Sequence, residues 1–222
     1  MRMKSTLLVG FSTIIVGCGG GDGGAVDSTS SQIDASSCFG IQLFEPGTRI
    51  TMTTRKNNID SVQNALVKNA QFQGQDVIEQ YNEDTGDSLY LTVDAANKSY
   101  FIVGGTDANQ EWYYSPPSKV AFDLKLGETD SGTHTMISGT DQFVYDESNK
   151  FVGMEVITIA AGTFDTCKFE HNSSVTLPSG EKKSISSERW VLSGYSIAIK
   201  IVAGGNTTEL VSGSINGDPI SN

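Results

Sequence analysis

The stretch YSIAIKIVAGGN, residues 195–206, decides the fold class of this chain. Large apolar side chains stand at every second position of its first half, with small or polar ones between them. A period of two places one set of side chains on the buried face of a strand and the other set on a wetter face. Gly204-Gly205-Asn206 then provides favourable turn chemistry. The stretch therefore predicts a half-buried β-strand that enters a tight turn.

The same alternation recurs along most of the chain from Cys38 onwards. Residues 120–126 repeat it, with Val120, Phe122 and Leu124 on one face. Closely spaced strands with short turns pair antiparallel, because parallel pairs need long crossovers. We therefore predict a mainly β fold, built as a single antiparallel curved sheet or an open or half barrel with at most one or two short helices. The further strand candidates are residues 48–55, 76–82, 88–94, 99–104, 133–145, 151–160, 164–171, 185–193 and 207–215.

Residues 60–72 fit two structures. A start at Asp60, apolar residues at helical spacing and an end at Gly74 would suit a helix. Val67 and Phe72, each among polar neighbours, would suit a strand equally well. The sequence leaves helix and strand open in this segment.

The overall composition excludes some classes of protein. A length of 222 residues with 37% hydrophobic residues suits one domain with a sizeable core. Lys and Arg number 15 against 26 Asp and Glu, which gives a formal net charge of −11. Because a nucleic-acid partner needs many cations to neutralise its phosphates, we expect no nucleic-acid binding.

The first 18 residues resemble the signal sequence of a bacterial lipoprotein. A basic start with Arg2 precedes a short apolar run, and a run of about ten residues is too short to cross a bilayer as a helix. Ile15-Val16-Gly17-Cys18 is similar to the lipobox, in which the cysteine is acylated after the signal is cut before it. The resemblance implies a membrane anchor of palmitate-like chains on Cys18, and several chains make such an anchor durable.

Residues 18–37 continue this pattern as a tether. Gly, Ser, Thr and Asp dominate after the cysteine, and no apolar period appears. Gly19 stands where a retention-type Asp could have stood, which by the same resemblance favours the outer membrane, on its periplasmic or surface face. The predicted organisation is a signal peptide at 1–17, the lipidated Cys18 with its flexible tether at 18–37, and an antiparallel β-domain at 38–222.

The two remaining cysteines, Cys38 and Cys167, form an even number in an oxidising compartment. We predict a disulfide between them, which by the chain-entropy model would stabilise the fold by roughly 4–5 kcal/mol. Free thiols or a redox role are the alternatives. No Cys-x-x-Cys motif supports redox chemistry.

Motifs that carry chemistry are largely absent. The sequence has no nucleophile elbow, phosphate loop, dinucleotide fingerprint or zinc-ligand spacing. We therefore predict no enzyme activity, no cofactor and no metal, and we interpret His134 and His171 as ordinary strand residues. Acidic turns such as residues 79–87 could hold calcium but are more often simply solvated. The aromatic run 112–114 could stack on a sugar or a peptide, or cover an open end of the sheet.

The segment from residue 115 to residue 212 resembles a loose group of uncharacterised bacterial periplasmic and lipid-anchored β-proteins. The most specific string is Ala161-Gly162-Thr163-Phe164, followed by Trp190. Ala160 stands where that group usually has proline, and Thr129 where an aromatic residue is common. The resemblance implies a curved antiparallel sheet, resembling the half-barrel of bacterial lipoprotein carriers, and it implies no reaction. Gly162 would permit a bend there.

The leading functional hypothesis is a lipid-anchored envelope protein with a non-catalytic structural or interaction role. A curled sheet could instead carry a lipid or another apolar ligand if its concave face is underfilled. A carbohydrate-active enzyme that motifs do not reveal is a further alternative. Expected partners are the membrane, through the acyl chains on Cys18, and a lipid or an envelope protein. The predicted apolar ligand face consists of Phe122, Leu124, Phe164, Trp190 and Ile199.

Overall fold

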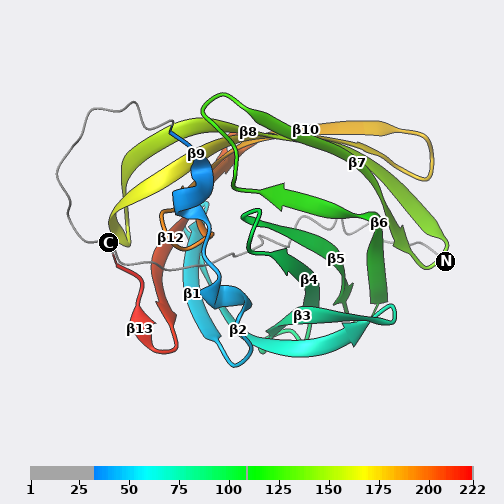
Figure 1. Cartoon of the computed structure of the whole chain (residues 1–222), viewed down its shortest axis with the longest axis horizontal. Coiled ribbons are helices and arrows are strands. Elements are labelled where there is room, and N and C mark those ends of the chain that lie inside the picture. Colours follow the sequence, from blue (N-terminus) through cyan, green and yellow to red (C-terminus); the bar gives the residue numbers. More distant parts are fainter. Residues whose placement is uncertain (1–32, 109, 222) are drawn as a thin grey trace.

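The computed structural model describes residues 33–108 and 110–221, which form one antiparallel sheet (Figure 1). The strands are β1 (Arg49–Lys56), β2 (Ile59–Phe72), β3 (Gln75–Asn82), β4 (Ser88–Asp94), β5 (Ser99–Asp107), β6 (Gln110–Ala121), β7 (Thr129–Ser138), β8 (Asp141–Ile159), β9 (Gly162–Thr176), β10 (Lys182–Leu192), β11 (Ala198–Ala203), β12 (Asn206–Ile215) and β13 (Asp218–Pro219). Two short 3-10 helices, η1 (Ala35–Cys38) and η2 (Gln42–Phe44), precede them.

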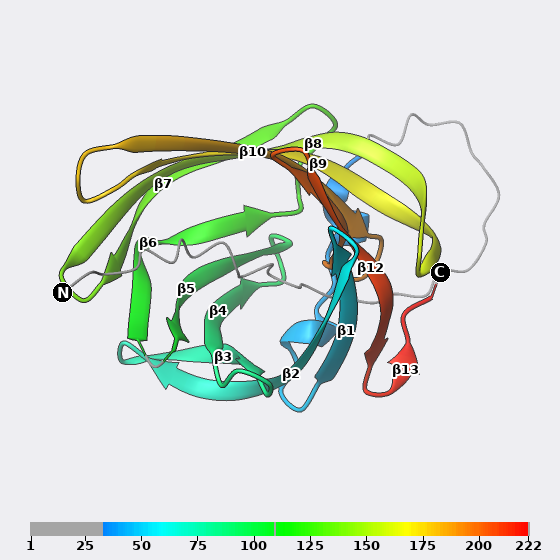
Figure 2. The same cartoon turned by 180° about the vertical axis from the view of Figure 1, so that it is seen from behind.

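The sheet closes on itself. Each strand pairs with the next one in the sequence, and β1 also pairs with β12, with Ile50 opposite Ile215. Strands β1 to β12 therefore form a barrel, and β13 is a short addition to β12 (Figures 1 and 2). The mainly β antiparallel class is confirmed. The expected open or half barrel is wrong, because β1 has a hydrogen-bonded partner on each side and leaves no free edge there.

The ambiguous segment at residues 60–72 is a strand. It is most of β2, which pairs with β1 on one side and with β3 on the other. Because both neighbours supply partners for its backbone N–H and C=O groups, the segment has no need of helical hydrogen bonds. Gln73 and Gly74 make the turn into β3, and both have positive φ.

Two strand predictions need correction. Residues 120–126 do not form a strand: β6 ends at Ala121, and an irregular segment follows. Phe122 and Leu124 are nevertheless buried, because extended backbone alternates its side chains whether or not it is paired. The predicted strand at 133–145 is divided by a turn at Gly139, after which β8 continues without interruption to Ile159.

The N-terminal part of the described chain packs onto the barrel. The N–H of Ala35 donates to the carbonyl of Leu124 at 2.9 Å, and the N–H of Ser196 donates to the carbonyl of Cys38 at 2.8 Å. Ala35 is fully buried in η1. Asp34 also forms a β-bridge with Lys125. The segment packed on the barrel therefore begins before residue 38, where we expected the tether to end.

Two large clusters and a third, smaller one make up the core. The first contains Phe122 and Leu124 together with most of the buried residues of the η1–η2 segment, and the second contains Phe164, Trp190 and Ile199. All five of these side chains are buried against other core residues. The predicted single apolar ligand face is thus divided between two packed clusters.

Several predictions lie outside the described residues. Cys18, the signal peptide at 1–17 and most of the tether fall there. Among the described residues, none of the helices has the length and apolar character needed to cross a membrane.

Candidate functional site

Strands β6 and β7 separate part of the way along their length. Their pairing runs only from Trp112 opposite Ser138 to Ser115 opposite Thr135, although β6 continues beside β5 and β7 continues beside β8. Pro116 and Pro117 come directly after the last pair. Because proline has no N–H, it cannot donate to a ladder and ends the pairing there. The two strands therefore diverge.

A cavity of about 280 Å³ lies at this divergence, lined by residues of both strands, including Ser118 on β6 and His134 on β7. The other principal lining residues are Tyr100, Tyr114, Glu147, His171 and Arg189. The cavity therefore gathers side chains from β5 to β10.

The register explains why these side chains meet. His171 lies opposite Asn149, and Arg189 lies opposite Phe169. Alternate residues of a strand share a face, so Glu147 and His171 point to the same side of the sheet as the buried Phe151 and Phe169. The cavity is thus the polar continuation of the inner face of the barrel.

Glu147 is the centre of the group. One carboxylate oxygen, Oε2, accepts a hydrogen bond from Ser118 Oγ at 3.4 Å and lies 3.5 Å from His134 Nε2. The other, Oε1, accepts from Ser173 Oγ at 3.4 Å and lies 3.9 Å from His171 Nε2. Each oxygen therefore faces one hydroxyl and one imidazole, contributed by β6, β7 and β9.

Both imidazoles are neutral at neutral pH. Burial, and then the positive charge of Arg189, lower the pKa of His171 to about 3. Burial also lowers the pKa of His134, although the charges of Glu147 and Asp146 act in the opposite direction. Neither histidine therefore supplies a cation to balance Glu147.

Aromatic rings hold His134 in place. Its ring stacks on Tyr145, with centroids 5.6 Å apart, and meets the edge of Tyr114 at 4.5 Å. Its side chain is only 4% exposed, and its Nε2 has no hydrogen-bond partner among the described residues. A buried polar atom without a partner costs stability, so this nitrogen is available to a ligand.

Arg189 supplies a positive charge. Its Nε is inaccessible to solvent and has no hydrogen-bond partner, and no described carboxylate oxygen lies within 4 Å of its nitrogens. Burial lowers the pKa of Arg189, with Tyr100 and Glu147 acting in the opposite direction. A guanidinium remains charged at neutral pH in spite of such a shift.

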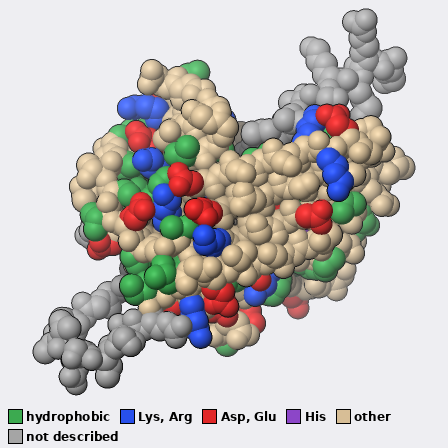
Figure 3. All heavy atoms as spheres, turned by 90° about the horizontal axis from the view of Figure 1, so that it is seen from above, with side chains coloured by type: hydrophobic (Ala, Val, Ile, Leu, Met, Phe, Trp, Pro, Cys, Tyr) green, Lys and Arg blue, Asp and Glu red, His purple; other side chains and the backbone are tan. Residues whose placement is uncertain are grey.

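A wider, more open depression of about 620 Å³ adjoins the cavity and shares Glu147 with it. Hydroxyl and amide side chains of β7 to β10, such as Ser184 and Asn172, line most of it. Figure 3 looks at the molecule from the side on which β7 to β10 lie in Figure 1, and uncharged groups predominate there with no histidine visible. The larger depression is exposed, and neither Arg189 nor either histidine lines it. We therefore regard the smaller cavity as the candidate site.

The arrangement does not resemble a hydrolase or a metal centre. Among the described residues, no serine hydroxyl hydrogen bonds to either histidine, since Ser118 and Ser173 both donate to Glu147. No group of three His, Cys, Asp or Glu residues in the described part of the chain is arranged to hold a metal ion. The cavity presents charged and hydrogen-bonding side chains to a molecule that enters it.

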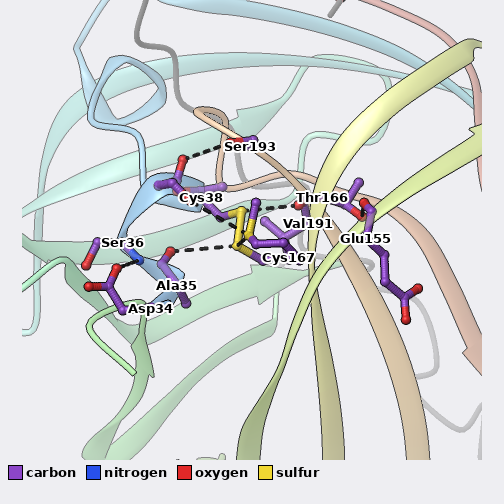
Figure 4. The surroundings of a disulfide bond; sticks show 12 residues. Asp34, Ala35, Ser36, Cys38, Glu155, Thr166, Cys167, Val191 and Ser193 are labelled. Carbon is purple, nitrogen blue, oxygen red and sulfur yellow. Dashed lines mark hydrogen bonds between the residues drawn. A yellow bond between two sulfur atoms is a disulfide. The ribbon is translucent and has the colours of Figure 1, made fainter. Parts of the chain in front are cut away.

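The predicted disulfide is confirmed. Cys38 in η1 is bonded to Cys167 in β9, and both residues are fully buried (Figure 4). The carbonyl oxygen of Val191 lies 3.5 Å from Cys38 Sγ, and the carbonyl oxygen of Ala35 and the Sδ of Met154 lie 3.8 Å and 3.3 Å from Cys167 Sγ. The bond ties the N-terminal segment to the barrel and takes no part in the cavity.

The sequence pointed to only part of the site. Tyr114, flagged within the aromatic run, lines the cavity, whereas Trp112 packs into the first core cluster. The interpretation of His134 and His171 as ordinary residues missed that both approach Glu147. The available signal was that they are the only two histidines of the chain and both stand in strand segments.

The fold and site define a closed antiparallel barrel with a polar internal cavity. No protein-family model matches the chain, and no curated protein is similar to it. Three solved structures are similar. A candidate lipoprotein from Parabacteroides distasonis has a TM-score of 0.45 at 13% identity, over 77% of this chain and 96% of the other.

The second structure is a candidate exported protein with a YmcC-like fold from Bacteroides fragilis, with a TM-score of 0.42 at 13% identity over 77% and 96% of the two chains. The third is the hypothetical lipoprotein YmcC of Escherichia coli, with a TM-score of 0.42 at 12% identity over 78% and 87%. At these scores the likeness carries no argument about function.

Proposed function

We propose that this protein is a lipid-anchored protein of the bacterial cell envelope whose barrel binds a small polar ligand without transforming it. The observation that carries the binding role is the cavity itself, in which Arg189 Nε and His134 Nε2 are buried without a hydrogen-bond partner among the described residues. Ligand sites are typically concave, with a few polar groups that converge.

The envelope location rests on the cysteines. Cys18 lies in a lipobox-like string, and the Cys38–Cys167 disulfide suits a compartment outside the cytosol. Anchoring is tested by Cys18→Ser. We expect the wild-type protein to take up labelled palmitate and to fractionate with membranes, and the variant to do neither. A membrane-bound variant, or an unlabelled wild type, would overturn the anchor.

A carrier of apolar ligands receives less support. The five residues expected to line its binding face are packed into two core clusters, and none of them lines the cavity of about 280 Å³. The cavity walls carry charged and hydroxyl groups, which an apolar ligand would leave desolvated and unpaired. A small molecule that forms hydrogen bonds fits them better.

The two histidines make the binding role directly testable, because the chain has no others and both line the cavity. Imidazole NMR signals of the lipidated protein in detergent are followed while glycerol, glucose, propionate, ethylammonium and L-alanine are added. We expect at least one compound to shift both signals. Both signals staying in place with every compound would contradict the binding role.

A cavity-blocking variant provides the matched control. Ser118 is 5% exposed and faces Glu147, so Ser118→Phe should fill the cavity and abolish the shifts. Ser61 is exposed on β2 and lines neither the cavity nor the adjoining depression, so Ser61→Phe is the control and should leave the shifts unchanged. Equal effects of both variants would mean that the shifts come from elsewhere.

A further inference from the structure

Besides the paired Lys119 and Asp130, the cavity is lined by one positive and one negative side chain, Arg189 and Glu147, which do not neutralise each other by direct contact. Among the described residues, the ion pairs within 4 Å that involve Glu147 are those with His134 and His171, and both imidazoles are neutral at neutral pH. The charge of Glu147 raises the pKa of Arg189, but the two residues do not form an ion pair within 4 Å. Neither charge therefore has a permanently charged partner of opposite sign within 4 Å among the described residues, although Glu147 accepts hydrogen bonds from Ser118 and Ser173.

The mouth of the cavity does not favour either sign of charge. Lys119 on β6 and Asp130 on β7 both line it, and Lys119 Nζ lies 3.6 Å from Asp130 Oδ2. These two side chains balance each other at the rim. Selection by charge therefore falls to Arg189 and Glu147 inside the cavity.

A ligand with a single charge fits only half of this arrangement. An anion next to Arg189 would approach the carboxylate of Glu147 and be repelled by it, and a cation next to Glu147 would approach Arg189. Unfavourable pairs of this kind are how binding sites reject wrong ligands. A ligand that carries both charges satisfies both side chains at once, through charge-assisted hydrogen bonds.

The size of the cavity limits the ligand. Its volume of about 280 Å³ lies just below the range of roughly 300–1,000 Å³ that is usual for small-molecule pockets. Tyr114 and His134 contribute an aromatic wall beside the charged groups. The space suits a compact molecule with a small side chain.

We infer that the cavity selects a small zwitterion of the amino-acid type, a free α-amino acid or a very short peptide, with its carboxylate at Arg189 and its ammonium group at Glu147. This inference rests on the proposed binding function and specifies its ligand.

The test uses calorimetry and the histidine NMR signals of the lipidated protein. The probes are L-alanine and L-alanyl-L-alanine as zwitterions, propionate, inorganic phosphate and galacturonate as anions, ethylammonium as a cation, and glycerol as a neutral molecule. We expect a zwitterion to bind at least about tenfold more tightly than any compound with one charge, because each charge-assisted hydrogen bond contributes that order of affinity.

Two variants assign the charges. Arg189→Gln should weaken the binding of the zwitterion at least about tenfold and leave ethylammonium no weaker. Glu147→Gln should weaken the zwitterion and ethylammonium but not propionate. The matched control is Arg55→Gln on β1, whose guanidinium pairs with the exposed Asp60 and should not affect binding. If Arg189→Gln fails to fold, the probe series on the wild type and on Glu147→Gln still tests whether the cavity prefers a zwitterion.

The outcomes separate this inference from the proposed function. Tighter binding of an anion, of ethylammonium or of glycerol than of either zwitterion would overturn the inference and leave the binding function standing. The absence of any shift or heat with every probe would overturn both. A soluble Cys18→Ser variant that binds L-alanine as the wild type does would support both the anchor and the ligand class.

Discussion

The inner face of the barrel has an apolar part and a polar part that adjoin along the same two strands. In the apolar part, Phe151 of β8 lies opposite Phe169 of β9, and both rings are buried. In the polar part, Glu147 lies opposite Ser173 and next to His171. Phe151 and Glu147 are four positions apart on β8, and Phe169 and Ser173 are four positions apart on β9. The interior changes from packed rings to charges and hydroxyl groups over this short length.

What fills the interior explains the difference. The N-terminal segment inserts Cys38, Phe39 and Phe44 into the core cluster that contains Phe151 and Phe169. None of these inserted residues lines the cavity. The apolar part of the interior stabilises the fold through close packing. The polar part keeps buried polar atoms without partners, which lowers stability, as is common at functional sites.

The largest expected effect concerns the bond that holds the inserted segment. Replacing both Cys38 and Cys167 by serine should lower the free energy of unfolding by about 5 kcal/mol, since the bond closes a loop over a sequence separation of 129 residues. Urea denaturation of the variant and the wild type measures this difference in unfolding free energy, and the chemically reduced wild type is the control. An unchanged midpoint would mean that packing alone holds the segment.

The second effect concerns packing in the apolar part. Phe151 is fully buried, so Phe151→Ala should cost about 3–5 kcal/mol of unfolding free energy, through lost burial and the cavity that remains. Val156→Ala on the same strand is the control, because Val156 is 68% exposed and its truncation should change stability by less than about 0.5 kcal/mol. Similar losses in both variants would contradict the assignment of the core.

The third effect belongs to the polar part and depends on pH. The pKa of His171 is lowered from 6.5 to about 3 in the folded protein. As the pH falls below 6.5, the unfolded chain binds a proton that the folded protein does not, so stability decreases. The loss from this residue should reach about 2 kcal/mol at pH 5.

The matched variant for this pH effect is His171→Gln, which cannot titrate in this range. Denaturation curves at pH 7.5 and pH 5 should show a smaller loss of stability for the variant than for the wild type. His134 contributes in the same direction and remains present in both proteins. Equal losses in the two proteins would show that His171 is not held neutral.

The smallest effect has the opposite sign. His134 is almost completely buried and its Nε2 lacks a partner, so His134→Phe should preserve the ring contacts with Tyr114 and Tyr145 while it removes the unsatisfied atom. We expect a gain in unfolding free energy of about 1 kcal/mol, measured by urea denaturation. A loss of stability would mean that the nitrogen makes a stabilising contact in the folded protein.

Part of the fold could be predicted because its signals are local. The alternation at 195–206 and its turn residues identify a strand and its antiparallel partner, and β11 and the start of β12 are found there. Residues 195–197 are an exception, because they lie between β10 and β11 and belong to neither strand. The pairing of Cys38 with Cys167 was predicted because the lipobox resemblance sets Cys18 aside and leaves these two cysteines in an oxidising compartment. The helix or strand ambiguity of residues 60–72 could not be resolved locally, because it depends on the neighbours that β1 and β3 provide.

The candidate site could not be predicted for a related reason. Ser118, Glu147 and Arg189 come from β6, β8 and β10, and nothing in their spacing brings them together. A shift of one residue in strand register would move each side chain to the other face of the sheet. For the same reason, the sequence did not indicate that His134 and His171 both approach Glu147.

The sequence by itself determined the antiparallel β class, because a period of two does not depend on how the strands are arranged. It also indicated the disulfide partners, because setting Cys18 aside for acylation leaves two of the three cysteines. Only the tertiary structure decided that β1 pairs with β12 to close the barrel, and that a charged cavity opens where Pro116 and Pro117 end the pairing of β6 with β7. The physical reason is that closure and register are set by hydrogen bonds and packing between residues far apart in the chain.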